Sequence, residues 1–304
     1  MIPPDILRRC VFLVGPTSVG KSEIALALAG KHGGEIVCAD AFQLYREFPV
    51  LSAQPTAEEQ NQIPHHLYGT IPCCEEIDAA RYADLVRPVL EEIIARGKMP
   101  FIVGGSGLYV QALTSGLPSL PAIDPVLRER VRGMTLKEMQ TKLRELDPQS
   151  LLAIDANNPR RVARRLELCL QTGQPASEVL TALPPTPGGL RGILFARSRE
   201  DMSARIESAV RQRLDHGAVD EVRVTREAAG GTARQILGWR EITAFLDGEL
   251  SGEECRERLT VATRQYAKRQ LTWFRGKSTF PEETISEVTP DISDRLARLL
   301  GLSR

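Results

Sequence analysis

This sequence of 304 residues lacks a long apolar run, a zinc-binding cysteine pattern and an excess of charge of one sign. The apolar run Cys10–Val14 near the N-terminus is too short for a signal peptide or a membrane span. The six cysteines include no CxxC pair, and the adjacent Cys73 and Cys74 have the wrong spacing for a zinc site. Scattered thiols without a secretory signal are typical of a reducing compartment. We therefore expect a cytoplasmic protein without a membrane segment.

The charges are balanced, with 39 basic and 39 acidic side chains. Net charge therefore gives no reason to expect a nucleic-acid partner, which would need a local basic patch. The hydrophobic share of 42% and the charged share of 26% are ordinary for a globular protein, and no repeat or low-complexity tract is visible. A chain of this length forms one large domain or two modest ones.

The first third of the sequence alternates short apolar runs with helical patterns. Candidate strands are Cys10–Val14, Glu35–Ala39 and Met99–Val103, and candidate helices are Ser22–Ala29 and Tyr82–Arg96. The apolar stripe expected for the second helix consists of Leu85, Val89, Ile93 and Ile94. Apolar strands separated by helices favour the α/β class, with a parallel sheet covered by helices.

The pattern changes near residue 118, where prolines cluster and strand signals stop. Three helices are predicted in succession, at Pro125–Arg132, Thr135–Leu146 and Asn158–Gln171. A second junction, LPPTPGG at 183–189, precedes a strand at Gly192–Ala196, and the chain from Arg199 to Arg275 is mostly helical in pattern. We expect a helical insertion at 118–190 within an α/β core made of 1–117 and 191–304. The tail after 276 carries little signal.

Residues 15–22 read GPTSVGKS, which matches the phosphate-binding loop pattern G-x-x-x-x-G-K-[ST]. The candidate ligand-binding residues are Gly15, Pro16, Thr17, Ser18, Val19, Gly20, Lys21 and Ser22. Backbone N–H groups of such a loop cradle phosphate oxygens, Lys21 adds a positive charge, and the Ser22 hydroxyl is a candidate Mg²⁺ ligand. A P-loop NTPase-like sheet is therefore expected. The alternative is a plain glycine turn, and the motif alone leaves kinase, NTPase and transferase open.

Two further candidates follow predicted strands. Asp40 lies in CADAFQLYR (38–46) after the second strand, and Ser106 lies in GGSGLY (104–109) after the third. The carboxyl ends of parallel strands form the ligand-binding edge of such sheets, so both side chains are expected beside the loop. Asp40 would act there as a general base or hold Mg²⁺ through water. The structural alternatives are a helix cap or turn for Asp40 and a plain turn for Ser106.

Two local clusters of basic residues are candidates for RNA contact. One is Arg160, Arg161, Arg164 and Arg165. The other contains Arg264, Lys268, Arg269 and Arg275, interleaved with the candidate stacking groups Tyr266, Trp273 and Phe274. The alternative for each cluster is a solvated basic face of a helix.

The motifs GPTSVGKS, DAFQLYR, PHHL (64–67) and GGSGLY, in this order and spacing, resemble those of the tRNA dimethylallyltransferases, the bacterial-type IPP transferase family. The resemblance continues in NPRRVARRLEL (158–168), RQILGWREI (234–242) and TRQYAKRQLTWFR (263–275), and it covers residues 10–276. It implies transfer of a dimethylallyl group from dimethylallyl diphosphate to N6 of an adenine next to the anticodon of tRNA, with release of pyrophosphate. The tRNA anticodon stem-loop as partner is implied with it. We further expect Mg²⁺ on Ser22, from the phosphate-loop motif, and a monomer.

The resemblance also implies roles for individual residues. Asp40 would be the general base, and Ser106 would lie with it in the catalytic site. The insertion 118–190 would bind tRNA. The residues implied to contact tRNA are Asp40, Ala41, Phe42, Gln43, Ser106, Arg128, Arg160, Arg161, Val162, Ala163, Arg164, Gln235, Ile236, Leu237, Gly238, Trp239 and Arg240.

The sequence departs from the family pattern at several positions. Ser106 replaces the usual Thr, Ala41 the usual Ser, and Gln54 stands where Lys is common. Ala209, in RIESAVRQRLDHG (205–217), occupies the position of a pyrophosphate-binding Arg. Arg211 is near in sequence, while Arg205 lies one helical turn earlier on the same face and is our candidate substitute in binding the diphosphate. These departures point to lower affinity for the diphosphate, a different donor or a divergent paralogue.

Three other functions stay open on the sequence. An adenylate isopentenyltransferase would use a free nucleotide as acceptor, although a helical insertion rich in arginine has no use there. A small-molecule P-loop kinase would consume ATP without prenylating an acceptor. A non-catalytic RNA-binding relative, suggested by Ala41 and Ala209, would bind tRNA without turnover.

Overall fold

The structure is a computed structural model that describes residues 2–118, 120–180, 185–287 and 289–302. The chain divides into two compact units. The first unit comprises Met1–Ser115 and Thr186–Arg304, and the second is Gly116–Pro185. The predicted junction at 183–189 is described only from residue 185 onward, because 183 and 184 lie outside the described residues.

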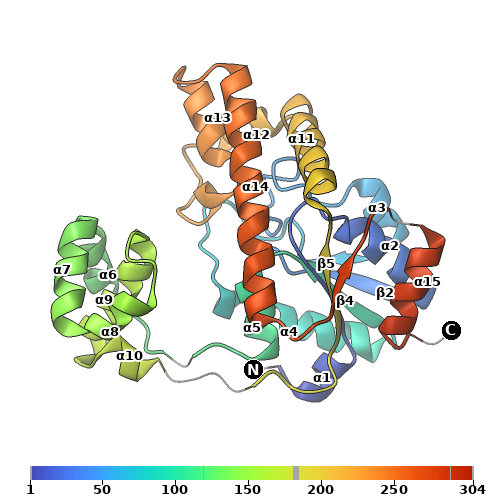
Figure 1. The fold of residues 1–304 in the computed structure, drawn as a ribbon, viewed down its shortest axis with the longest axis horizontal. Coiled ribbons are helices and arrows are strands. Elements are labelled where there is room, and N and C mark those ends of the chain that lie inside the picture. Colours follow the sequence, from blue (N-terminus) through green and yellow to red (C-terminus); the bar gives the residue numbers. More distant parts are fainter. Residues whose placement is uncertain (1, 119, 181–184, 288, 303–304) are drawn as a thin grey trace. The chain divides into compact units, whose positions relative to one another are not determined.

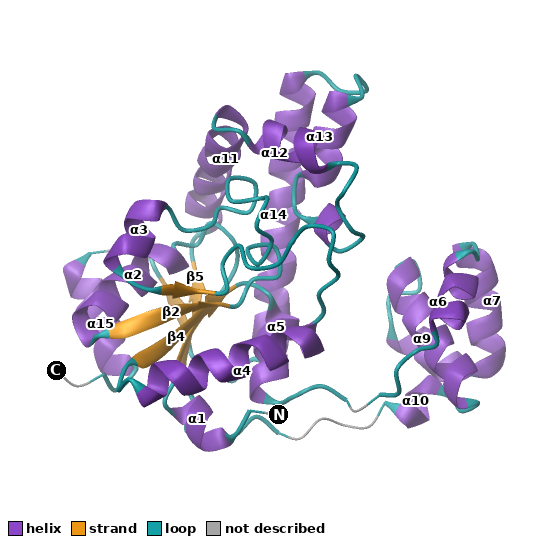
Figure 2. Cartoon of the chain, turned by 180° about the vertical axis from the view of Figure 1, so that it is seen from behind, coloured by secondary structure: helices purple, strands orange, loops and turns teal. Residues whose placement is uncertain are grey.

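The first unit is built around one six-stranded sheet (Figures 1 and 2). Its strands are β1 (Val11–Val14), β2 (Gly34–Cys38), β3 (His65–His66), β4 (Met99–Gly104), β5 (Arg191–Ala196) and β6 (Glu282–Thr284). Their order is β3-β2-β4-β1-β5-β6, and every neighbouring pair is parallel. The predicted parallel α/β sheet is thus confirmed. All strands end at the same edge, with the central strand β1 leading directly into the phosphate loop.

Helices surround this sheet in the first unit. They are α1 (Pro4–Arg8), α2 (Lys21–His32), α3 (Ala57–Gln62), α4 (Ala79–Ala95), α5 (Gly107–Thr114), α11 (Arg199–Asp215), α12 (Ala218–Thr225), α13 (Trp239–Leu246), α14 (Gly252–Lys277) and α15 (Pro290–Leu299), with the 3-10 turn η1 (Ala233–Gln235). Helix α14 is the longest; it packs against α11 and α13, and its C-terminal part reaches α5 (Figure 1). Among the described residues, no helix has the length and apolarity to span a membrane.

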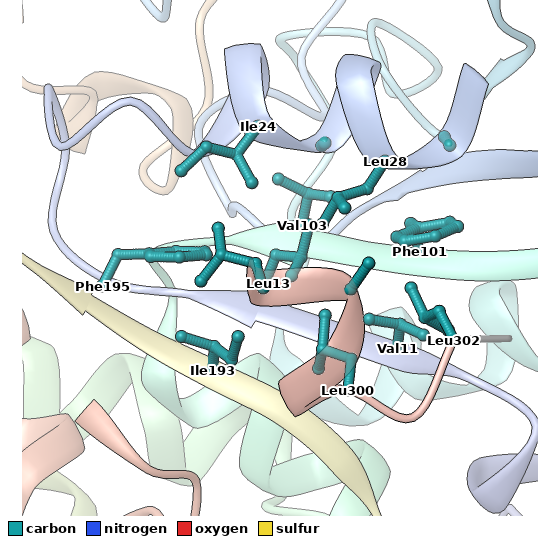
Figure 3. Close-up of a cluster of buried hydrophobic side chains, with 14 of the residues drawn as sticks. Val11, Leu13, Ile24, Leu28, Phe101, Val103, Ile193, Phe195, Leu300 and Leu302 are labelled. Carbon is teal, nitrogen blue, oxygen red and sulfur yellow. The ribbon is translucent and has the colours of Figure 1, made fainter. Parts of the chain in front are cut away.

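One face of the sheet is covered by α2 and by the segment around α15. Alternate strand residues point to this face, because side chains in a strand have a period of two. Figure 3 shows them meeting Ile24 and Leu28 of α2 and the buried Leu300 and Leu302. The same cluster contains Leu296 of α15. Residues 290–302, which belong to the tail where we expected little structure, therefore complete this core.

Helix α4 packs against β4 on the other side. Its buried side chains are Tyr82, Val86, Leu90 and Ile93, so the predicted stripe was wrong by one position at Leu85 and Val89, which are only half-buried. Two chemically similar apolar rows run side by side on this helix, and only tertiary packing decides which one faces the sheet. The Tyr82 hydroxyl donates to the carbonyl oxygen of Cys38 at 2.8 Å, which fixes the end of β2.

The second unit is helical. Its helices are α6 (Pro125–Arg132), α7 (Leu136–Leu146), α8 (Pro148–Ala153), α9 (Pro159–Thr172) and α10 (Ala176–Val179). The three predicted helices are confirmed, while the short α8 and α10 were not predicted. The unit has its own apolar core, formed around Val131, Leu143, Val162 and Leu166, all fully buried. It therefore has an internal source of hydrophobic stability.

Candidate active site

The phosphate loop joins β1 to α2 at the carboxyl edge of the sheet. Gly20 caps α2 with a φ of 100°, a left-handed conformation that glycine adopts without steric cost. The Lys21 ammonium donates to the carbonyl oxygen of Pro16 at 2.7 Å. Burial lowers the pKa of Lys21 to about 8. The hydroxyl of Ser18, whose φ is 63°, is buried without a hydrogen-bond partner among the described residues. The loop thus carries donors that its own fold does not satisfy.

Asp40 follows β2, separated from β1 by β4. The N–H of Ala39 still pairs with Val103 at 2.8 Å, so the sheet ladder holds the chain up to this point. One carboxylate oxygen of Asp40 accepts from the N–H of Phe42 at 3.1 Å, as in the turn considered for this residue. Burial raises the pKa of Asp40, against the opposing effects of that N–H and of the positive charge on Lys21. The carboxyl is therefore a stronger proton acceptor than an exposed aspartate.

The end of β4 approaches this loop closely. A Cβ on Gly104 would lie 2.0 Å from the carbonyl oxygen of Ala39, so only glycine fits. The Ser106 hydroxyl accepts a hydrogen bond from the N–H of Ala41 at 2.9 Å. Ser106 therefore ties the loop after β4 to the loop after β2, and it does not line the cavity described below. Ser106 keeps the hydroxyl of the usual Thr, and this hydroxyl is hydrogen-bonded to the backbone of Ala41.

The loop after Asp40 is held by two glutamine side chains. Gln43 donates from Nε2 to the carbonyl oxygen of Ser52 at 3.3 Å and also lines the cavity. Gln54, which stands where the family commonly has Lys, donates to the carbonyl oxygen of Tyr45 at 2.7 Å. Gln54 is thus engaged in loop structure and lies outside the cavity lining.

Helix α14 brings a buried glutamine to both loops. Gln270 accepts from the N–H of Thr17 at 2.9 Å and donates to the carbonyl oxygen of Gly105 at 2.9 Å. One turn away, the Tyr266 ring lies 5.6 Å from the ring of Phe42. Trp273 packs against Gly107 so closely that a Cβ there would meet its ring at 2.2 Å. The inner face of α14 therefore fixes the relative position of the phosphate loop and the loop after β4.

Helix α11 supplies arginines to the other side of the phosphate loop. Arg205 donates from Nε to the carbonyl oxygen of Ser18 at 3.0 Å, and it lines the cavity with Ala209 and Arg213. Arg211, the other arginine weighed from the sequence, is exposed and is not part of the lining. Just before the helix, Arg197 donates to the carbonyl oxygen of Val19 at 2.7 Å.

These elements enclose a cavity of about 500 Å³, a size that suits a small-molecule ligand. Lys21, Arg205 and Arg213 contribute positive charge to its wall, and Asp40, Glu23 and Glu59 contribute carboxylates. Ser22 also lines it, so a hydroxyl and the Asp40 carboxylate share one space. In the described ranges there is no group of three or more His, Cys, Asp or Glu residues arranged to hold a metal. The donors present fit Mg²⁺, which is commonly held by one or two side chains together with phosphate oxygens and water.

The predicted RNA-contact residues of the first unit differ in accessibility. Asp40 and Gln43 line the cavity, Ala41 and Phe42 lie between them outside its lining, and Arg240 is exposed at the start of α13. The side chains of Ile236 and Trp239 are only 2% and 6% exposed, so these two residues can offer RNA little beyond their backbone. Apolar side chains in the motif RQILGWREI thus serve the core, with the Trp239 ring edge-on to Phe48 at 5.6 Å.

The basic cluster on α14 is less available than its sequence indicated. Arg275 pairs with Glu282 at 2.6 Å, and Arg264 pairs with Glu207. Phe274 is fully buried, so the prediction that it stacks on RNA was wrong. Glu207 on α11 is 57 positions from Arg264, so no local pattern indicated that pair, whereas Glu282 on β6 is only seven positions from Arg275.

In the second unit the predicted contacts lie on α6 and α9. Arg128, Arg160 and Arg161 are exposed, and Arg164 pairs with Glu167 at 3.6 Å. The half-buried Ala163 packs against the core that contains Val162. Asn158 caps α9 by accepting from the N–H groups of Arg160 and Arg161, which sets the first turn that carries the arginines. This unit therefore displays a basic, solvent-accessible helix end.

Sequence reasoning missed two residues of the cavity region. Arg213 could have been found, since positions 205, 209 and 213 repeat every four residues along one helix face. Gln270 gave no signal, because its partners are 253 and 165 positions away in the chain.

Comparison with known proteins gives a consistent result. A family model described as IPP transferase matches residues 43–277. The tRNA dimethylallyltransferase of Parvibaculum lavamentivorans is 39% identical over 314 residues, covering 97% of this chain and 98% of that protein. The tRNA isopentenylpyrophosphate transferase of Bacillus halodurans has a similar structure, with a TM-score of 0.69, 33% identity and 96% coverage of both chains. A eukaryotic dimethylallyltransferase acting on tRNA gives a TM-score of 0.76 at 26% identity, over 95% of this chain and 77% of that one. This protein belongs to the IPP transferase family.

Proposed function

We propose that this protein transfers a dimethylallyl group from dimethylallyl diphosphate to N6 of an adenine next to the anticodon in tRNA, releasing pyrophosphate. The observation that carries the proposal is one cavity lined by both Lys21 of the phosphate loop and the half-buried Asp40. The names of the relatives that match nearly the whole chain support the same reaction.

The loop would bind the diphosphate. Pyrophosphate leaves with growing negative charge while the allylic carbon becomes positive, so groups that stabilise the leaving group accelerate the reaction. Lys21, the backbone N–H groups at the start of α2 and the free hydroxyl of Ser18 are donors suited to phosphate oxygens. Arg205 lines the same space and is the sequence-based candidate for this role. A nucleotide-type loop would thus serve a reaction that needs no ATP.

Asp40 would take the proton. The exocyclic amine of adenine is a weak nucleophile, and it becomes cationic as its bond to carbon forms. A nearby carboxylate that accepts its proton completes the transfer. The raised pKa of Asp40 makes the carboxylate a better acceptor, and the positive charge on Lys21 opposes that rise. Ser106 would position this region by its bond to Ala41.

Mg²⁺ would be held by Ser22 together with the diphosphate and water, and Asp40 lines the same cavity. When bound, it would neutralise charge on the leaving group. The protein residues named above would bind and orient the donor whether or not Asp40 touches the metal shell.

The exposed arginines of α6 and α9 would contact tRNA phosphates in the anticodon stem-loop, with Arg240 and Gln43 contributing from the first unit. Phosphate contacts provide most of the affinity of nucleic-acid complexes and make it salt-dependent. The adenine must leave its stack to reach a carboxylate inside a cavity, which selects an unpaired loop nucleotide as acceptor.

The test is a prenylation assay with unmodified tRNA, Mg²⁺ and labelled dimethylallyl diphosphate. Label in a single adenine of the tRNA, with pyrophosphate released in equal amount, is the expected result. Label in free AMP but not in tRNA would instead identify an adenylate isopentenyltransferase. ATP consumption without acceptor prenylation would identify a kinase, and tRNA binding without transfer of any allylic group would leave only an RNA-binding relative.

A further inference from the structure

Helix α11 presents Arg205, Ala209 and Arg213 to the cavity at intervals of four residues. This spacing places the three side chains on one face of the helix. Arg205 is anchored by its hydrogen bond to Ser18 at 3.0 Å. Arg213 acts electrostatically on Asp40, but among the described residues its Nε has no hydrogen-bond partner. The two arginines of this face therefore differ. The Nε of Arg205 is hydrogen-bonded within the protein, whereas in the described part of the chain the Nε of Arg213 is not.

Arg213 is only 9% exposed, which is rare for an arginine without a partner. Its Nε is buried with no hydrogen-bond acceptor among the described residues. No carboxylate of the described chain forms an ion pair with it, and Asp40 acts on it at longer range. Burial lowers the pKa of its guanidinium. A buried cation with unsatisfied donors destabilises the folded protein, so the missing contacts call for a ligand.

A comparison with Arg197 shows that burial alone does not leave an arginine of this protein without hydrogen-bond acceptors. Arg197 is 8% exposed, similar to Arg213. It nevertheless donates from Nε to Val19 at 2.7 Å and pairs with Asp201 at 2.6 Å. The fold thus satisfies most donors of one buried arginine and leaves the cavity-facing one unsatisfied.

The cavity that Arg213 lines is chemically suited to a phosphate group. Lys21 and Ser22 line it as well, and the buried Ser18 hydroxyl also lacks a partner among the described residues. A guanidinium presents N–H donors in a planar fork that matches two oxygens of a phosphate. We propose that Arg213 binds the diphosphate of the donor and holds it as it leaves as pyrophosphate. This inference rests on the proposed function for the identity of the anion.

The position of Arg213 also accounts for Ala209. The family resemblance places a pyrophosphate-binding arginine at 209, where this chain has no charge. Arg213 supplies a guanidinium one turn further along the same face, and Arg205 flanks the position one turn before. The chain thus keeps a cationic leaving-group site in a shifted place.

The test measures binding of inorganic pyrophosphate with Mg²⁺ by calorimetry, without tRNA. Arg213→Gln should weaken binding about 10- to 100-fold, because charge-assisted hydrogen bonds are lost. The matched control Arg211→Gln removes the same charge from the exposed face of the same helix and should change binding less than about twofold. In the double variant Ala209→Arg with Arg213→Gln, at least part of the affinity should return.

Unchanged pyrophosphate binding in a folded Arg213→Gln variant would overturn the proposal. If that variant does not fold, protection of Arg213 from chemical modification can be measured in the wild-type protein instead. Arginine modification by phenylglyoxal, mapped by mass spectrometry, should be suppressed at Arg213 and unchanged at Arg211 when pyrophosphate is present. Equal modification of Arg213 with and without pyrophosphate would equally overturn it.

Failure of this inference differs from failure of the proposed function. Wild-type protein that prenylates tRNA, with Arg213→Gln binding pyrophosphate normally, removes only the role of Arg213. Wild-type protein that binds pyrophosphate through Arg213 but labels no adenine supports the site and removes the proposed reaction.

Discussion

Two arginine-bearing helices of this molecule place their charges in opposite surroundings. Helix α9 carries Arg160 and Arg161 on an exposed first turn, whereas α11 carries Arg213 against a cavity wall with 9% exposure. A charge in water costs little, and its interactions are weakened by salt. A buried charge is costly until an anion replaces its lost hydration. The difference shows that burial decides which anion an arginine suits. The exposed arginines of α9 suit a long, hydrated polyanion, and the buried Arg213 of α11 suits a small, enclosed anion.

The largest effect is expected at Asp40, the proposed general base in the cavity wall. Asp40→Asn should lower the single-turnover prenylation rate about 10²- to 10⁴-fold, as expected on removing a general base. Pyrophosphate affinity at neutral pH should be retained or increase, because a negative charge leaves the cavity wall. Rapid-quench assays and calorimetry measure the two quantities. A normal rate in Asp40→Asn would contradict the assignment of the base.

The second prediction concerns the pH dependence of pyrophosphate binding, which tests whether burial lowers the pKa of Lys21. The pKa of Lys21 is lowered to about 8, so its ammonium loses its proton as the pH rises through that value. Wild-type pyrophosphate affinity should therefore fall above pH of about 8, although pyrophosphate itself becomes more anionic there. Lys21→Met should bind about 10- to 100-fold more weakly at neutral pH and should lack this decline. A decline of the same size in the variant would assign the titration to another group.

The third prediction compares two glutamines on α14. Gln270→Leu leaves the N–H of Thr17 and the carbonyl oxygen of Gly105 without a partner, so the free energy of unfolding should fall by about 2 kcal/mol. Gln265→Leu, on the exposed side of the same helix, should change it by less than about 0.5 kcal/mol. Urea denaturation measures both. Equal losses of unfolding free energy in the two variants would contradict a structural role for the hydrogen bonds of Gln270.

The smallest effect is expected on the exposed helix. Arg161→Gln should weaken tRNA binding only severalfold and reduce the slope of log affinity against log salt by about 1. Pyrophosphate affinity and thermal stability should not change, because the side chain faces water. Filter binding across a salt series checks this. A salt slope equal to that of the wild type would remove Arg161 from the RNA contact.

Local patterns in the sequence predicted most of the sheet. A continuous apolar run followed by glycine identified β1 and its loop, because a strand buried on both faces needs no polar alternation. The missed elements depend on distant partners. The edge strand β6 has three residues and pairs with β5, and α15 is held by contacts to α2. β6 is too short for a periodic signal, whereas α15 follows the capping Thr289 with Ile292 and Leu296 at helical spacing, so this helix could have been predicted and was overlooked.

The candidate site divides in the same way. Lys21 and Asp40 belong to short motifs directly after strands, so the sequence alone could bring them together. Arg205, Arg211 and Arg213 lie within one helix, and the rotation of that helix on its neighbours decides which of them line the cavity. That rotation is set by the packing of Ile206 and Val210 against Leu259, a tertiary contact.

The residues that flank the helical insertion lie side by side. The Ser115 and Thr186 hydroxyls are 2.7 Å apart, so the chain leaves the sheet-containing unit and re-enters it at almost one point. Such an attachment makes residues 116–185 a side branch that can be lengthened, shortened or exchanged while the strand order stays intact. The tRNA contacts proposed for this branch could thus be exchanged by grafting a different insertion at this point, while the cavity of the sheet-containing unit stays unaltered.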